Sequence, residues 1–309
     1  MKFKNSMLET VSFAPLGETK FILLISNAIY SWGSDEVIFL SSQFRRNSLM
    51  ATFNGTDFSD IITARGTNDI LNGNGDSDIL TGNGGNDTIN GGSGDDILNA
   101  GSGNDSLIGG LGDDILNAGS GSDALRGYSG DDILNGDSGN DVLSGDSGND
   151  ILNGDSGNDV LSGDSGDDIL NGDSGNDILT GGTGNDSLIG GTGTDVLTGG
   201  SGKDVFEFDS VSDSPTGFLR DVITDFVGNG SLPGDRIDVS SIDANSTRGG
   251  DQAFIFIGAG AFSAPGQIRY SGGILQGSTD GDLSAEFEVR LVGAPQLVAS
   301  DIIFVNPNS

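Results

Sequence analysis

Apolar and polar residues recur along the middle of this chain with a period of nine. Between Gly55 and Glu207, an Ile, Leu or Phe stands at the same place in all 17 successive nonapeptides, from Ile62 to Phe206. Each apolar residue lies within a three-residue segment that can extend as a strand, and six turn-forming residues separate one segment from the next. Because a strand that short directs one side chain inwards, the pattern predicts a solenoid with one buried apolar side chain per repeat.

A second period of 18 residues is superimposed on the first. Residues 133–150 and 151–168 differ at a single position, where Asn149 corresponds to Asp167. If successive strands lie on opposite sides, two nonapeptides close one coil, and coils stack with neighbouring strands about 4.8 Å apart. The sequence therefore predicts an all-β fold, a parallel β-roll over residues 55–207.

The flanking segments differ from the array. Residues 208–309 form a C-terminal segment outside the nine-residue period. Residues 1–54 form an N-terminal segment whose only apolar run, Phe21 to Ile25, is too short to span a membrane. Met50 opens a stretch that leads directly into the array, which suggests the hypothesis that translation starts there and that residues 1–49 are a mis-assigned or unpacked extension.

Charge and composition exclude several functions. The 309 residues carry a net charge of −33 and contain no His and no Cys. This composition rules out the common zinc sites, Ser-His-Asp and Cys-His catalysis, and disulfide bonds. Strong acidity disfavours nucleic acid and anionic membranes as partners. The array alone carries −26 of the net charge, so cations are the expected counterpart.

An Asp precedes each buried apolar residue by two positions, in all 17 repeats. Stacked coils would place these carboxylates one strand spacing apart, where two of them repel by roughly 3.5 kcal/mol at an effective dielectric constant of 20. Oxygen ligands in flexible geometry are typical of calcium. Two columns of stacked turns contain 15 gaps, and one Ca²⁺ in each would nearly balance the array. We expect the chain to be unfolded without calcium and folded with it.

The repeat resembles the RTX nonapeptide, GGxGxDxUx, which is known as a calcium-binding parallel β-helix motif. Residues 91–99 (GGSGDDILN) match it fully, whereas Asp replaces the second Gly in the middle copies. The resemblance implies that multiple Ca²⁺ ions are bound by turn carbonyl groups and by the sixth-position carboxylates: Asp60, Asp69, Asp78, Asp87, Asp96, Asp105, Asp114, Asp123, Asp132, Asp141, Asp150, Asp159, Asp168, Asp177, Asp186, Asp195 and Asp204.

Residues 202–305 resemble the region that follows the repeats in serralysin-type metallopeptidases, in stretches such as 204–215 (DVFEFDSVSDSP) and 234–245 (GDRIDVSSIDAN). The resemblance implies that residues 208–309 form a β domain that caps the roll and carries a signal for type I export. It also implies further ligands at Asp221 and Asp225, and an acidic loop at 278–282 whose first position is Ser278 instead of Asp. Without His there is no HExxH motif, so the protease activity does not transfer.

These observations favour a non-enzymatic, calcium-binding bacterial protein that is secreted to the extracellular space by a type I apparatus. Two alternatives remain open. An outward stripe of Ile or Val at the seventh position, in 13 of 17 repeats, suits self-association in an adhesin or surface layer. The polar ninth-position ladder, with the many carboxylates, leaves open a cell-surface glycan as partner or a carboxylate-based enzyme acting on polysaccharide. A disordered acidic linker is the simplest competing interpretation.

Overall fold

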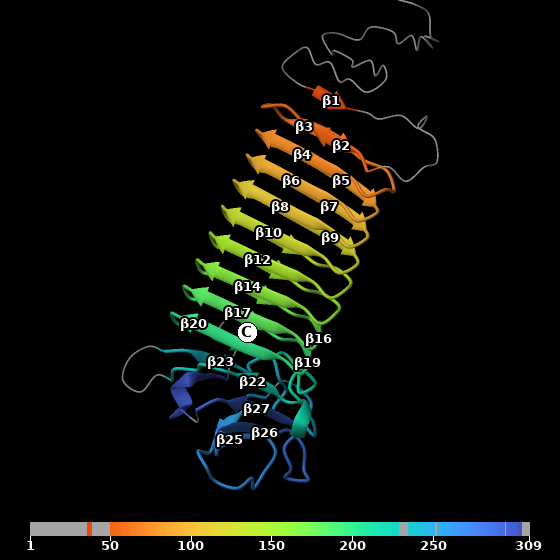
Figure 1. The fold of residues 1–309 in the computed structure, drawn as a ribbon. Helices are drawn as coiled ribbons and strands as arrows, with labels where there is room; N and C mark the ends of the chain where they lie inside the picture. Colours follow the sequence, from red (N-terminus) through yellow and green to blue (C-terminus); the bar gives the residue numbers. More distant parts are fainter. Residues whose placement is uncertain (1–35, 39–49, 229–233, 251, 294, 305–309) are drawn as a thin grey trace, which may run out of the picture.

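The structure, a computed structural model, describes residues 36–38, 50–228, 234–250, 252–293 and 295–304. Two long sheets run along the molecule and face each other across the coils (Figure 1). Odd-numbered repeats supply one sheet and even-numbered repeats the other, so the chain crosses between the sheets at every turn. The prediction of an all-β parallel β-roll is confirmed.

We call the 12-stranded sheet sheet A. Its strands, in spatial order, are β1 (Glu36–Ile38), β3 (Asp60–Thr63), β5 (Ile79–Gly84), β7 (Ile97–Ser102), β9 (Ile115–Ser120), β11 (Ile133–Asn135), β13 (Ile151–Asn153), β15 (Ile169–Asn171), β18 (Ser187–Ile189), β21 (Val205–Glu207), β23 (Arg236–Asp238) and β28 (Ile302–Ile303). Every strand pairs in parallel with its neighbours.

We call the 14-stranded sheet sheet B. Its order is β2 (Thr52–Asn54), β4 (Ile70–Gly75), β6 (Thr88–Ser93), β8 (Ser106–Leu111), β10 (Ala124–Ser129), β12 (Val142–Ser147), β14 (Val160–Ser165), β17 (Ile178–Thr183), β20 (Val196–Ser201), β22 (Asp221–Ile223), β27 (Phe287–Leu291), β26 (Ile274–Ser278), β25 (Gln267–Ser271) and β24 (Ile255–Phe256). A small pair, β16 (Ser174–Gly175) with β19 (Thr192–Gly193), and two 3-10 turns, η1 (Gly217–Leu219) and η2 (Ala299–Asp301), complete the described elements.

The register confirms the 18-residue coil. Ile133 pairs with Ile151, and Val142 pairs with Val160. The strands differ from the expected three residues, because most strands of sheet B and strands β5, β7 and β9 of sheet A extend to six. Because identical turns are stacked in register, backbone N–H and C=O groups of neighbouring turns lie opposite one another. The first turn residues therefore also form strand hydrogen bonds with the neighbouring coil.

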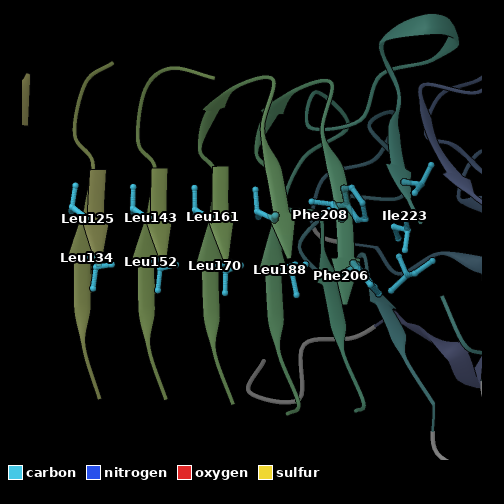
Figure 2. Packing of buried hydrophobic residues seen from close by; sticks show 14 of the residues in the cluster. Leu125, Leu134, Leu143, Leu152, Leu161, Leu170, Leu188, Phe206, Phe208 and Ile223 are labelled. Carbon is cyan, nitrogen blue, oxygen red and sulfur yellow. The ribbon is translucent and has the colours of Figure 1, made fainter. Parts of the chain in front are cut away.

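The core is a double row of apolar side chains between the sheets (Figure 2). Leu125, Leu143 and Leu161 come from sheet B, Leu134 and Leu152 come from sheet A, and each is at most 2 % exposed. At the C-terminal end the row continues into larger side chains, where the Phe208 and Phe287 rings meet edge to face with centroids 5.2 Å apart. Stacking of repeats thus leads without a break into the packing of the C-terminal part.

Both sheets continue beyond Glu207. Strands β22 and β23 add one further strand to each sheet, and the antiparallel strands β25, β26 and β27 extend sheet B alone.

At the other end β1 pairs with β3. The hypothesis about residues 1–49 otherwise concerns residues outside the described part. The division of the chain into three parts, with boundaries after residues 54 and 207, stays a prediction. Among the described residues, no helix is long and apolar enough to span a membrane.

The core predicts a sharp contrast between two adjacent residues. Leu152 is fully buried, whereas its neighbour Ile151 is 36 % exposed on the outer face. Replacing a buried Leu with Ala costs about 2–5 kcal/mol through lost burial and the remaining cavity. We expect Leu152→Ala to lower the thermal unfolding midpoint clearly in saturating calcium, and Ile151→Ala to change it little. Equal shifts measured by circular dichroism would contradict this packing.

Candidate metal centre

The sixth-position aspartates form two columns, one along each sheet. Each Asp lies at the start of a strand, directly after a turn, and its backbone N–H donates to the carboxylate Oδ1 of the Asp 18 residues later. The Asp132 amide donates to Asp150 Oδ1 at 2.8 Å, and the Asp150 amide donates to Asp168 Oδ1 at 2.8 Å. The same bond recurs from Asp60 to Asp186, so the columns are hydrogen-bonded ladders.

The columns are buried, and each carboxylate uses only part of its acceptor capacity. The 17 side chains are at most 4 % exposed. One buried carboxylate oxygen has no hydrogen-bond partner in every column residue but one: Oδ1 in Asp60, and Oδ2 in Asp78, Asp87, Asp96, Asp105, Asp114, Asp123, Asp132, Asp141, Asp150, Asp159, Asp168, Asp177, Asp186, Asp195 and Asp204. The exception is Asp69, whose two oxygens accept from the Ala51 amide and the Thr67 hydroxyl.

The first-position glycines lie between these free oxygens and backbone carbonyl groups. A Cβ atom on Gly127, the first residue of its repeat, would lie 2.9 Å from the carbonyl oxygen of Gly145 and would collide with Asp132 Oδ2. The lack of a side chain therefore leaves a space bordered by a carboxylate and a carbonyl oxygen. That donor set fits Ca²⁺, which takes both kinds of oxygen in irregular geometry. Three repeats carry a buried Ala at this position, Ala64, Ala100 and Ala118, and there a methyl group takes up part of the space.

Burial makes the charged form of the column carboxylates costly. Desolvation, reinforced by neighbouring carboxylates, raises the pKa of Asp114 and Asp141 to about 7 and the pKa of Asp150 to about 6. The ion pairs among the described residues are Arg126–Asp146 and Arg220–Glu288, so no Lys or Arg there forms an ion pair with a column carboxylate. A divalent cation against the free oxygens would supply the missing charge and favour the ionised form.

The C-terminal part continues the columns. Asp221 Oδ1 accepts from the Asp195 amide at 2.7 Å, while Asp221 Oδ2 is buried without a partner, and burial raises the pKa of this carboxyl to about 8. The structure thus places predicted Asp221 with the column of sheet B. Asp225 lies outside both columns, where its two oxygens accept from the amides of Gly199 and Gly200 at 3.0 and 2.8 Å.

Sequence reasoning missed Asp235, which ends the column of sheet A. Its Oδ1 accepts from the Asp204 amide at 3.1 Å, and its Oδ2 accepts from the Val227 amide at 2.7 Å. A signal was present, because Asp235 precedes buried Ile237 by two positions, as in every repeat. Both oxygens of Asp235 have protein partners, so this column is closed by hydrogen bonds.

The second-position aspartates of the middle repeats are placed differently. Asp137 and Asp173 are exposed and Asp155 is half-buried, and with Ser and Thr hydroxyl groups they line an open groove. Asp146 forms a two-pronged ion pair with Arg126, whose guanidinium also lies 4.3 Å from the Tyr128 ring centroid. These carboxylates face solvent and add negative charge around the columns.

Comparison with known proteins gives a match to a protein family and matches to 32 chains of solved structures, one of which is described below. The sequence profile of the RTX calcium-binding nonapeptide repeat matches residues 52–80, 72–107, 90–125, 108–143, 144–179, 171–206 and 180–214, which together span more than half of the chain. The solution structure of the AlgE6R3 subunit from the Azotobacter vinelandii mannuronan C5-epimerase is 29 % identical, with a TM-score of 0.26, over 60 % of this chain and 80 % of that chain. No curated protein matches.

Two adjacent aspartates allow a matched test of the columns. Asp132 is 1 % exposed and has an unpartnered oxygen, whereas Asp131 is exposed and bonds the Asn149 amide. We expect Asp132→Asn to remove a calcium ligand and cost about 1.4 kcal/mol per lost site at a calcium concentration ten times the dissociation constant. Asp131→Asn should change calcium affinity little. Calcium titration of the two variants checks this, and equal affinities would contradict the assignment.

Proposed function

Because this chain belongs to the family of RTX calcium-binding nonapeptide repeat proteins, we propose that its two aspartate columns, with Asp221, hold a series of Ca²⁺ ions between successive coils. The observation that carries the proposal is the row of buried carboxylate oxygens without a protein partner. The family match and the oxygen-only donor set both favour calcium. In this proposal the protein is a calcium-binding β-roll with a structural or interaction role, not an enzyme.

We further propose that calcium decides whether the roll folds. Burying like-charged carboxylates one above another opposes folding, and the array has few opposite charges to offset them. Sites with dissociation constants of roughly 10⁻⁴ M would be empty in the cytosol and largely filled outside the cell. At ten times that concentration each ion contributes about 1.4 kcal/mol. Summed over many coils, this contribution is large enough to change an unfolded chain into a folded one.

The C-terminal part is proposed to begin the folding. Each column residue donates its amide to a carboxylate of the following coil, so the ladder is completed from the C-terminal side. The last two amides depend on residues beyond the array: Asp195 donates to Asp221, and Asp204 donates to Asp235. A formed C-terminal part therefore presents the first acceptors on which the preceding coils can assemble.

Secretion fits this behaviour. A chain that stays unfolded at cytosolic calcium would remain competent for export and would fold on arrival outside. We propose type I export with the signal in the C-terminal part, as its resemblance to the region after serralysin repeats implies, and a bacterial, extracellular location. The lack of Cys agrees with this route, because folding then needs no oxidation step.

The outer face of sheet A favours a second function, that of an adhesin or surface-layer component. Ile61, Ile79, Ile97, Ile115, Ile151 and Ile169 are at least 36 % exposed, and all lie in one register-matched row. Such a row suits a contact with another copy or with a surface. Self-association that appears only in calcium would favour this function over a monomeric module.

Calcium titration tests the central proposal. We expect the far-UV circular dichroism of the full chain to change from a disordered to a β spectrum as calcium rises into the millimolar range, and to revert when a chelator is added. Magnesium should be less effective, because it requires stricter octahedral geometry. A spectrum that is already β-rich in chelator and unchanged by calcium would overturn the proposal.

The order of assembly gives a separate prediction. Asp204 lies in the last coil of the array and Asp60 in the first, and both side chains are 1 % exposed. If the roll assembles from its C-terminal end, Asp204→Asn should slow calcium-induced folding strongly, whereas Asp60→Asn should leave the rate nearly unchanged. Stopped-flow fluorescence or dichroism after calcium addition measures the rates, and equal slowing by the two substitutions would count against this order.

A further inference from the structure

One recurring pair of residues in the array is chemically reactive. Five repeats end in Asn and are followed by a repeat that begins with Gly, at Asn72, Asn90, Asn135, Asn153 and Asn171. In an Asn-Gly pair the Gly nitrogen can attack the side-chain amide of the Asn. Gly favours this attack, because it has no side chain to hinder the approach and leaves the backbone free to rotate. Each of these pairs is therefore a candidate site of deamidation.

The reaction needs only water. At Asn135, the backbone nitrogen of Gly136 bonds to the side-chain carbonyl carbon, and the side-chain nitrogen leaves as ammonia with the proton of the attacking nitrogen. Water then opens the five-membered imide to aspartate or to isoaspartate. One water molecule is consumed and one ammonia is released, and nothing is oxidised or reduced.

The folded roll holds the two reacting groups apart. Asn135 ends strand β11, and the Gly136 amide donates to the Asn153 carbonyl of the next coil at 2.9 Å. The Gly154 amide likewise donates to the Asn171 carbonyl at 2.8 Å. In an extended strand the following peptide nitrogen points away from the side chain, so ring closure requires the strand to open first.

The side-chain amides of sheet A are fixed as well. Asn117 Nδ2 donates to Asn99 Oδ1 at 2.9 Å, and Asn135 Nδ2 donates to Asn117 Oδ1 at 2.8 Å. Asn153 Nδ2 continues the row to Asn135 Oδ1 at 2.8 Å. All four side chains are half-buried. Attack on Asn135 would therefore break this asparagine ladder in addition to the backbone hydrogen bond.

The Gly that makes the Asn reactive is also the Gly that leaves room beside a column carboxylate. A Cβ atom on Gly136 would lie 2.7 Å from Asp141 Oδ2. Asn99 and Asn117 belong to the same ladder, but each is followed by Ala. The methyl group of Ala hinders the attack and takes up part of that space. The reactive pair is thus tied to the repeats that keep the most room for a cation.

We propose that Asn135 and Asn153 are sites of spontaneous deamidation, open while the chain lacks calcium and closed in the folded roll. The inference rests on the proposed calcium-driven folding. Aspartate in place of either Asn removes an amide donor from the ladder and sets a carboxylate against an amide oxygen. Isoaspartate adds one carbon atom to the main chain, which disturbs the stacking register. The chain can therefore stay unfolded for only a limited time before it loses the ability to complete the stack.

Peptide mass spectrometry tests the proposal on the full chain, held in mildly alkaline buffer with calcium or with a chelator. In chelator, Asn135 and Asn153 should convert about tenfold faster than Asn99 and Asn117, because Gly leaves the attack unhindered. In saturating calcium their conversion should slow by about tenfold, because the reaction then waits for local opening.

Circular dichroism of the same samples separates the two ways in which this test can fail. Equal conversion of Asn135 and Asn153 in both buffers, with a spectrum that does change to β in calcium, overturns the proposed protection alone. A spectrum that does not respond to calcium refutes calcium-driven folding, and the calcium dependence of deamidation fails with it.

Gly136→Ala isolates the reaction within one chain. Ala stands at this position in the repeats that begin with Ala100 and Ala118, so the variant introduces a residue that the array already contains. In chelator, the substitution should slow the conversion of Asn135 to the rate of Asn99, while Asn153 keeps its wild-type rate as the internal reference. The rates are measured on the unfolded chain, so an effect on folding does not enter. An unchanged rate at Asn135 overturns the assignment.

Refolding of aged samples tests the consequence. After partial deamidation in chelator, calcium is added and a protease digests the molecules that remain unfolded. Peptides with a modified Asn135 should be enriched in the digested fraction, because their register is disturbed. Equal shares of modified Asn135 in the digested and the resistant fractions would show that the modification leaves the stack intact and would contradict the proposed limit on the unfolded time.

Discussion

The stacking of buried carboxylates is the constraint on which the rest of this structure depends. From Asp78 to Asp204, each column residue is buried, lies one strand spacing from the next, and accepts a backbone N–H on one oxygen while its other oxygen has no partner. The ionised form of such a column is costly, since desolvation and its neighbours raise the pKa of Asp141 to about 7. In the proposed calcium-loaded roll, the Gly at the first position of most repeats, the 18-residue register and the acidic composition all serve to accommodate cations between these oxygens.

The ladder has a direction, and its two ends are therefore different. Every column amide needs an acceptor from the following coil, so the C-terminal part must provide two carboxylates that the repeats cannot. Asp221 provides one and keeps an unpartnered oxygen, which continues the sheet B column as a possible ion site. Asp235 provides the other, but the Val227 amide occupies its second oxygen, so the sheet A column is closed by protein alone. The first coil, by contrast, exposes Phe58 and Met50.

Much of the roll could be predicted from the sequence because its period is free of insertions. One apolar residue and one Asp per nonapeptide determine the inward side, the stacking distance and the columns. The local hydrogen bonds could not be derived in this way: the bond from the Asp132 amide to Asp150 depends on how far the carboxylate reaches back along the stack. Asp235 lay beyond the periodic region, 31 residues after Asp204 instead of 18, so its D-x-I pattern was visible but its place in the column was not. The six-residue strands were also missed, since their second halves are made of residues that ordinarily form turns.

The exposed carboxylates of the array can be understood from the same ion count. One divalent ion in each of 15 gaps would bring more positive charge than 17 column carboxylates carry, which would leave the roll strongly positive. The remaining acids of the array, among them Asp137, Asp155 and Asp173, lie at the turns and offset that surplus. They lie near the surface, but burial and the neighbouring Asp155 raise the pKa of Asp137 and Asp173, so their ionised form also carries a cost in the folded state. Salt partly screens their interaction with the nearby columns. In the proposed calcium-loaded roll, the array therefore combines two sets of carboxylates, a buried set placed to coordinate ions and a more exposed set that brings the roll close to neutrality.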